Sequence, residues 1–128
     1  MITDEQGRTL LLHRNNGKHM QWEIPGGKID AGETAEQAAA REIKEELGVD
    51  IEILEKIGDA GFTQGRRKYH YTWFSAVVSG GQPKVAEPKT FDNLEYFSPA
   101  QMREIYDQLS PNTQNFLNQQ GGGKLKAV

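Results

Sequence analysis

The sequence contains no cysteine among its 128 residues. This absence excludes disulfide bonds, a zinc site built on thiolates and a cysteine nucleophile. The chain also has no apolar N-terminal leader and no apolar run of about eighteen residues, so we expect no membrane segment and a cytoplasmic location. The net charge of −3 excludes a general basic field, and we therefore expect no polymeric nucleic acid as a partner.

The length allows one domain with a substantial core, which we place at residues 1–120. Residues 121–128 begin with three consecutive glycines after two glutamines. This composition predicts a flexible C-terminal tail.

Alternation and turn signals predict strands separated by helices along the chain. Thr34 with Gln37 has the pattern of a capping box, and Gly48 is a typical helix stop. Strands with helices on both sides predict an α/β sandwich. The expected strands are 1–3, 9–13, 22–24, 51–57, 68–78 and 94–97, and the expected helices are 34–47, 98–109 and 112–119.

The most specific feature lies between Gly27 and Val49. It consists of Gly27, Glu33 and the run Arg41-Glu42-Ile43-Lys44-Glu45-Glu46-Leu47-Gly48-Val49. At average residue frequencies, such a combination arises by chance on the order of once in 10^9 starting points. No other part of the sequence approaches this specificity.

Three carboxylates of this run are spaced to share one face of a helix. Glu42, Glu45 and Glu46 stand at i, i+3 and i+4, one turn apart. Such a cluster repels itself unless a cation joins it, and oxygen ligands without cysteine indicate Mg2+ or Mn2+. The alternative is a solvated, glutamate-rich helix face.

The segment ahead of the helix favours the metal site over the solvated face. Residues 22–28 read as a short strand that runs into the pair Gly26-Gly27. Paired glycines allow close approach of the backbone to a ligand, and a glycine loop before a helix N-terminus suits phosphate. A metal cluster beside such a loop predicts phosphoryl chemistry.

The constellation resembles the Nudix box, with every position filled. The resemblance implies the Nudix α/β/α fold around a mixed β-sheet. It also implies metal-dependent hydrolysis of a nucleoside diphosphate linked to another group, X. Residues 22–25, the compact length and residues 87–97 are similar to MutT-type members, which implies a (deoxy)nucleoside triphosphate cleaved to monophosphate and pyrophosphate. The alternatives are an ADP-ribose or nucleotide-sugar pyrophosphatase, and a sensor that binds nucleotides without cleaving them.

The resemblance also implies roles for single residues. Glu42, Glu45 and Glu46 would bind the divalent cation, and the carbonyl of Gly26 would complete its shell. Glu87, in a loop after the longest expected strand, is the best distal candidate for a further acidic ligand; its alternative is an exposed loop carboxylate. The general base is left open among Glu42, Glu46 and Glu87.

Glu33 and Arg41 match a pair that usually has a structural role in the family. The arginine would orient the catalytic glutamates, and Glu33 would neutralise it. We therefore expect scaffolding more than chemistry from both residues, with impaired catalysis when either is lost.

Substrate contacts are less strongly indicated. Arg14 ends an apolar strand where relatives place a phosphate-binding arginine, and Lys28 follows the glycine pair. Tyr69 and Phe91 are candidates for stacking on a base. The basic run 66–68 could meet phosphates, although a solvated turn is the preferred interpretation.

The first strand departs from the family pattern. Only Met1 and Ile2 precede the first turn, where related chains have more residues. A short strand leaves a thin sheet edge, which favours pairing with a second chain. Monomer and homodimer both remain open.

Overall fold

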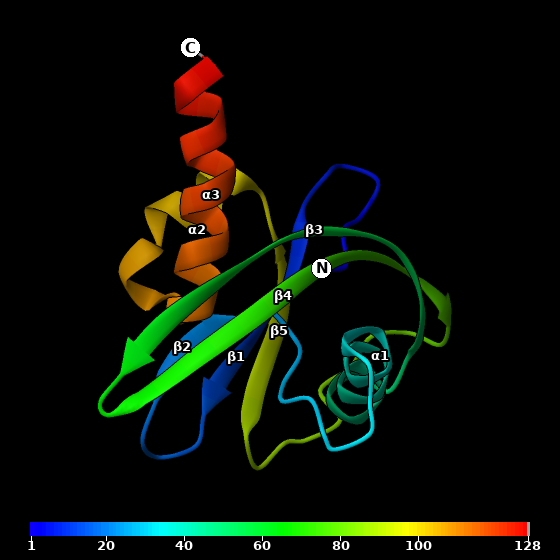
Figure 1. Ribbon diagram of the computed structural model, residues 1–128. Coiled ribbons are helices and arrows are strands. Elements are labelled where there is room, and N and C mark those ends of the chain that lie inside the picture. Colours follow the sequence, from blue (N-terminus) through cyan, green and yellow to red (C-terminus); the bar gives the residue numbers. More distant parts are fainter. Residues whose placement is uncertain (128) are drawn as a thin grey trace.

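The computed structural model describes the backbone of residues 1–127 and the side chains of residues 1–120. Three strands form one antiparallel sheet in the order β2-β1-β5 (Figure 1). They are β1 (Thr9–Asn15), β2 (Met20–Glu23) and β5 (Phe91–Phe97). Because β1 and β2 are antiparallel, the carboxyl end of β1 lies beside the start of β2, and Glu23 at the end of β2 lies opposite Leu12.

Two long strands form a second antiparallel sheet. β3 (Asp50–Gln64) and β4 (Arg67–Gly80) pair along their whole length as a hairpin. Among the described residues parallel pairing occurs only in isolated bridges, such as the one between Ile2 and Ala76. The predicted α/β fold is confirmed; its named strands form two antiparallel sheets, and Ile2 and Thr3 bridge β4 and β1, the first of these bridges being parallel.

Helices lie on two sides of the strands. Figure 1 shows α1 on one side and α2 and α3 on the other. No helix within residues 1–127 has the length and apolar character needed to cross a membrane. The helical elements are α1 (Ala35–Leu47), α2 (Pro99–Glu104), the 3₁₀ helix η1 (Tyr106–Gln108) and α3 (Pro111–Ala127).

Some boundaries differ from the sequence expectations. β3 continues to Gln64, beyond the predicted end at residue 57. Residues 58–61 have low β-propensity, but their pairing with β4 keeps them in the strand. The expected helix 98–109 divides into α2 and η1. α3 continues to Ala127 through most of the segment predicted to be a flexible tail, whose flexibility stays a prediction. Val128 lies outside the described residues.

Helix α1 begins and ends as the sequence predicts. Thr34 Oγ1 accepts from Gln37 N at 3.1 Å, and Gln37 Oε1 accepts from Thr34 N at 2.9 Å. Gly48 ends the helix in the left-handed region at φ 72°. Ile43 and Leu47 are buried in the core, and Glu46 is buried with them, whereas Glu45 is exposed.

Strand β1 packs into two hydrophobic cores, one on each face. Leu11 belongs to the core that contains Trp73 and residues of α2 and α3. Leu10 and Leu12 belong to the core that contains α1. All three leucines are fully buried, so β1 is fixed on both faces and holds the residues at its carboxyl end in place.

Candidate active site

Glu46 is a buried carboxylate with one hydrogen-bond donor. Its residue is 5% exposed, and Gly26 N donates to its Oε1 at 2.8 Å. The pKa of Glu46 is raised to about 8, mainly by burial; the Gly26 N–H lowers it, and the charges of Glu42, Glu23 and Glu87 contribute to the rise. The neighbouring charges that act on this carboxyl group are therefore negative.

Glu42 lies against the glycine loop. A Cβ on Gly27 would come within 2.5 Å of the Glu42 Cδ and Oε2 atoms, far inside contact distance. A side chain at position 27 would therefore displace the Glu42 carboxylate from its place against the loop. Gly26 and Gly27 thus bring loop backbone to two of the three predicted ligands, Glu46 and Glu42.

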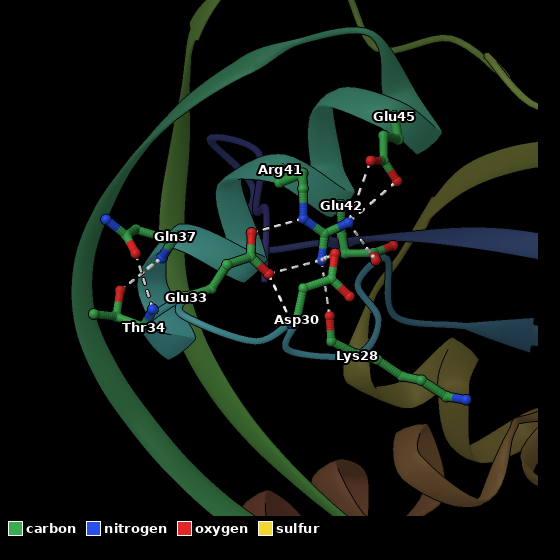
Figure 2. A network of polar contacts seen from close by, with 8 residues as sticks. All are labelled: Lys28, Asp30, Glu33, Thr34, Gln37, Arg41, Glu42 and Glu45. Carbon is green, nitrogen blue, oxygen red and sulfur yellow. Dashed lines mark hydrogen bonds and ion pairs between the residues drawn. The ribbon is translucent and has the colours of Figure 1, made fainter.

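Arg41 is surrounded by carboxylates, as Figure 2 shows. Its Nε and Nη2 donate to the two oxygens of Glu33 at 2.7 and 3.0 Å, a bidentate pair. Nη1 donates to Glu42 at 2.9 Å and to Glu45 at 3.2 Å, and Asp30 lies 3.3 Å from Nη2. Glu33 is the main cause of a raised Arg41 pKa, and Arg41 in turn lowers the pKa of Glu33.

The same guanidinium ties the loop to the helix. Its Nη2 donates to the Lys28 carbonyl at 2.9 Å (Figure 2), while Glu33 Oε1 accepts from Asp30 N at 2.8 Å. The predicted pairing of Glu33 with Arg41 is therefore present. The expectation that these residues act as scaffold stays a prediction.

The donor chemistry suits a divalent cation, although the carboxylates do not converge. Within the described residues, no group of three acidic or imidazole side chains is placed to hold one ion. Glu42 and Glu45 face Arg41, whereas Glu46 faces Gly26. The buried carboxyl group of Glu46 fits a hard cation that replaces its proton, and shared binding by all three requires Glu42 and Glu45 to turn from Arg41.

A cleft of about 510 Å³ brings several predicted residues together. It is lined by the glycine loop, by Glu42 and Glu46 of α1, by the carboxyl end of β1 and by the first part of β4. The predicted residues that line it are Arg14, Gly26, Lys28, Glu42, Glu46 and Tyr69, whereas Glu33, Arg41, Glu45, Glu87 and Phe91 do not line it.

Glu87 lies behind this cleft in a loop joined to α1. Ala86 N donates to the Glu46 carbonyl at 3.0 Å, and Thr90 N donates to the Glu87 carbonyl at 3.0 Å. Glu87 itself is exposed, yet its charge contributes to the raised pKa of Glu46. Its role as a distal ligand stays a prediction.

The stacking role predicted for Phe91 is wrong. Phe91 is 2% exposed and belongs to the core beside α1, so its ring cannot reach a ligand. Its ring instead supports Arg14, whose guanidinium carbon lies 4.9 Å from the ring centroid. Arg14 also donates from Nε and Nη2 to Glu23 at 3.0 and 2.7 Å, which raises the pKa of Arg14.

Tyr69 lies in an aromatic row on the hairpin. Its ring stacks on Phe62 at 5.2 Å between centroids, and Tyr71 stacks on the same ring at 5.7 Å. Tyr69 and Tyr71 both line the cleft. The basic run 66–68 lies at the hairpin turn and the start of β4.

The sequence alone gives no indication that three further residues belong to the cleft or to the ion pairs of Arg41. Glu23 binds Arg14 because β1 and β2 pair, and their register is not visible in the sequence. Asp30 joins Arg41 from a loop of unpredictable shape. Asn112 lines the cleft and accepts from Trp73 Nε1 at 2.9 Å across 39 residues of sequence.

Comparison with known proteins gives matches over most of the chain. The family model described as the NUDIX domain matches residues 1–119. A Mycobacterium tuberculosis (strain H37Rv) protein, whose name proposes an 8-oxo-dGTP diphosphatase, is 50% identical over 88 residues, 66% of this chain and 59% of the relative. A Bacillus subtilis relative with a name of the same kind is 32% identical over 102 residues, 80% of this chain and 65% of the relative. The chain thus spans less than two thirds of either relative.

The solved structures show the same fold. The crystal structure of a MutT NUDIX hydrolase from Burkholderia pseudomallei superposes with a TM-score of 0.65 at 27% identity. The match covers 84% of this chain and 92% of that one. The fold is therefore shared with this relative over most of both chains.

Proposed function

The chain belongs to the Nudix family, and we propose that it hydrolyses (deoxy)nucleoside triphosphates to the monophosphate and pyrophosphate with Mg2+, or Mn2+ in its place. The observation that carries the proposal is Glu46, a buried carboxylate of raised pKa beside a second carboxylate and a glycine loop at the edge of a cleft. A purely structural helix face does not need a buried carboxyl group of raised pKa.

The cation would be held by Glu42, Glu45 and Glu46, with the Gly26 carbonyl and Glu87 as further oxygen donors. When bound, it supplies charge neutralisation at the phosphate oxygens and lowers the pKa of a bound water. The Gly26 N–H holds one oxygen of Glu46, which fixes the orientation of that carboxylate.

In the reaction, a water oxygen forms a bond to phosphorus and the bond from phosphorus to the bridging oxygen breaks. A carboxylate takes the water proton. Glu42 and Glu46 line the cleft, and Glu87 lies close enough to affect Glu46, so these three remain the candidates for the base. Arg41, held by Glu33, contacts Glu42 and Glu45 and would hold them in place before they turn to the cation.

The cleft residues support a nucleotide as the small-molecule partner. Arg14 and Lys28 place positive charge at the cleft, and Tyr69 offers a ring at its wall. The names of the two curated relatives make an oxidised purine triphosphate, 8-oxo-dGTP, the first substrate to examine. A cytoplasmic location and a monomeric or homodimeric state are part of the same proposal.

The test is release of pyrophosphate and phosphate from a nucleotide panel with Mg2+, for the wild type beside Glu45→Gln. The panel holds ordinary and oxidised triphosphates, ADP-ribose and a dinucleoside polyphosphate. Glu36→Gln, an exposed change on the same helix, is the matched control. We expect triphosphate turnover that Glu45→Gln abolishes and Glu36→Gln retains.

Other outcomes have definite meanings. Turnover of ADP-ribose alone would keep the chemistry and replace the substrate. Tight nucleotide binding without turnover of any panel member would refute the enzyme and favour a sensor.

A further inference from the structure

Asn112, in the first turn of α3, is fixed in place by the contacts of its neighbours. Ser110 N donates to the Trp22 carbonyl at 2.8 Å, and Ile24 N donates to Thr113 Oγ1 at 2.9 Å. Thr113 is fully buried. The start of α3 is therefore joined to β2 and to the residue that follows it, and Asn112 keeps a constant position in the cleft wall.

The orientation of the Asn112 amide is set by Trp73 of β4. Trp73 Nε1 donates to Asn112 Oδ1 at 2.9 Å. An indole N–H can only donate, whereas an asparagine amide accepts through its oxygen and donates through its nitrogen. The contact therefore requires the amide oxygen to face Trp73, which leaves the Nδ2 atom for other partners.

Trp73 is itself held by the core. It is 3% exposed and belongs to the cluster that contains residues of α2 and α3. Its ring meets Phe116 edge-on, with 5.6 Å between the ring centroids. A ring packed in this way has no room to rotate, so the core fixes the orientation of the amide before any ligand binds.

The free end of the amide is available to the cleft. Among the residues whose side chains the structure describes, none accepts from Asn112 Nδ2, and no buried side-chain polar atom lacks a partner, so Nδ2 is accessible. Tyr71 stands two residues before Trp73 on the same face of β4 and lines the same cleft. The cleft therefore presents N–H donors beside a ring on which a base could stack.

We propose that Trp73 is a positioning residue that selects the base of the nucleotide. Because it holds the Asn112 oxygen, the cleft offers a donor at this point, and the base must present a carbonyl oxygen there. The ligands are nucleotides of 6-oxopurines, such as guanine, or of 4-oxopyrimidines, such as uracil. Adenine and cytosine carry an amino group at the same ring positions, so two donors would face each other. The inference rests on the proposed function, since it takes a nucleotide as the ligand of the cleft.

The experiment measures the binding of nucleoside monophosphates by calorimetry without metal, so it requires no turnover. Two pairs of ligands replace the carbonyl by an amino group: deoxyinosine against deoxyadenosine monophosphate, and deoxyuridine against deoxycytidine monophosphate. In the pair that binds better, we expect the wild type to bind the oxo member about tenfold more tightly, because an unmatched donor loses its hydrogen bond.

Trp73→Phe removes the N–H donor and keeps an aromatic ring in the core. The freed amide can turn over and accept from an amino group, so the preference for the oxo member should fall to within about twofold. Trp22→Phe is the matched control, since Trp22 packs against the same core through Phe97 but is not the donor to Asn112. It should keep the full preference. A preference that survives Trp73→Phe would overturn the proposal.

Asn112→Asp tests the same contact without a change in the core. One carboxylate oxygen accepts from Trp73 and the other offers an acceptor to the cleft, so the preference should reverse toward the amino member by about tenfold. The added charge acts on both members of a pair alike and leaves their ratio unchanged.

Three other results would also overturn the proposal: a wild type that does not discriminate within either pair, no binding of any monophosphate, or an unchanged ratio in Asn112→Asp. The expected ratios together with no turnover of any triphosphate would refute the proposed hydrolysis and still support this inference.

Discussion

Arg41 and Glu46 lie five residues apart on α1, yet their surroundings are opposite. Arg41 is partly exposed and has four carboxylates within ion-pair distance (Figure 2). Glu46 is buried and receives one backbone N–H, with further negative charges nearby. The charge of Arg41 is balanced by its carboxylate neighbours, and its hydrogen bonds join the loop to the helix. Glu46 has negative neighbours instead, which favours binding of a cation there.

Glu46→Gln tests this contrast with the largest expected effect. The substitution removes a ligand and a candidate base, so kcat should fall about 10²- to 10⁴-fold. Steady-state kinetics with Mg2+ measures it, with Glu36→Gln as the control. Retention of more than half of the activity would contradict the role given to Glu46.

The same variant should be more stable than the wild type in the absence of metal. The folded pKa of Glu46 is about 8, above its ordinary value of 4.5, so the folded state holds this proton more tightly. The contribution of Glu46 to stability is therefore greatest below about pH 4.5 and is lost as pH rises toward 8. Glutamine does not ionise, so its Tm advantage should grow between pH 6 and pH 9; an advantage that shrinks would refute the assignment.

Arg41→Lys tests the ion pairs of Arg41 and should lower kcat less than Glu46→Gln does. Lysine keeps the charge but cannot donate two parallel bonds to Glu33, so the glutamates lose their fixed orientation. We expect a fall in kcat of about 10- to 100-fold. Glu33→Gln should have a similar effect, and the double variant should be no worse than the poorer single one, because both act through one ion pair. Additive losses would indicate separate roles.

Metal binding should depend on pH through Glu46. A cation replaces the proton of this carboxylate, so affinity should rise with pH below about 8 and level off above it. Calorimetric titration with Mn2+ in two buffers of different ionisation enthalpy measures the protons released. We expect about a tenfold gain in affinity per pH unit between 6 and 7, and release of no proton would place the cation away from Glu46.

Asp30→Asn should have the smallest effect. Asp30 is 3.3 Å from Arg41, but its side chain is 68% exposed, and such pairs contribute little in water. We expect kcat to change by less than about twofold. A larger loss of kcat would show that the function of Arg41 depends on all four of its carboxylate neighbours.

Local sequence signals predicted α1 and its surroundings well. The capping box at Thr34 and Gln37 and the stop at Gly48 are set by neighbours within one turn, and all three are confirmed. The Glu33–Arg41 pair follows from the family motif and is also present. The class of the fold follows from the alternation of strands and helices.

Contacts that join distant segments could not be predicted in this way. Phe91 resembled an exposed aromatic residue after a loop, but pairing of β5 with β1 places it in the core beneath Arg14. Glu23 contacts Arg14 because of the register in which β1 and β2 pair. The division into two sheets likewise depends on tertiary packing that no short window of sequence contains.

The clamp of Arg14 between Glu23 and Phe91 has a consequence for selectivity. An anion that engages Arg14 must compete with a carboxylate that already makes two hydrogen bonds to it. A weakly charged ligand gains little from that exchange, whereas a polyphosphate offers several oxygens at once. If Arg14 contacts the substrate as proposed, its pairing with Glu23 would favour a triphosphate over a monophosphate.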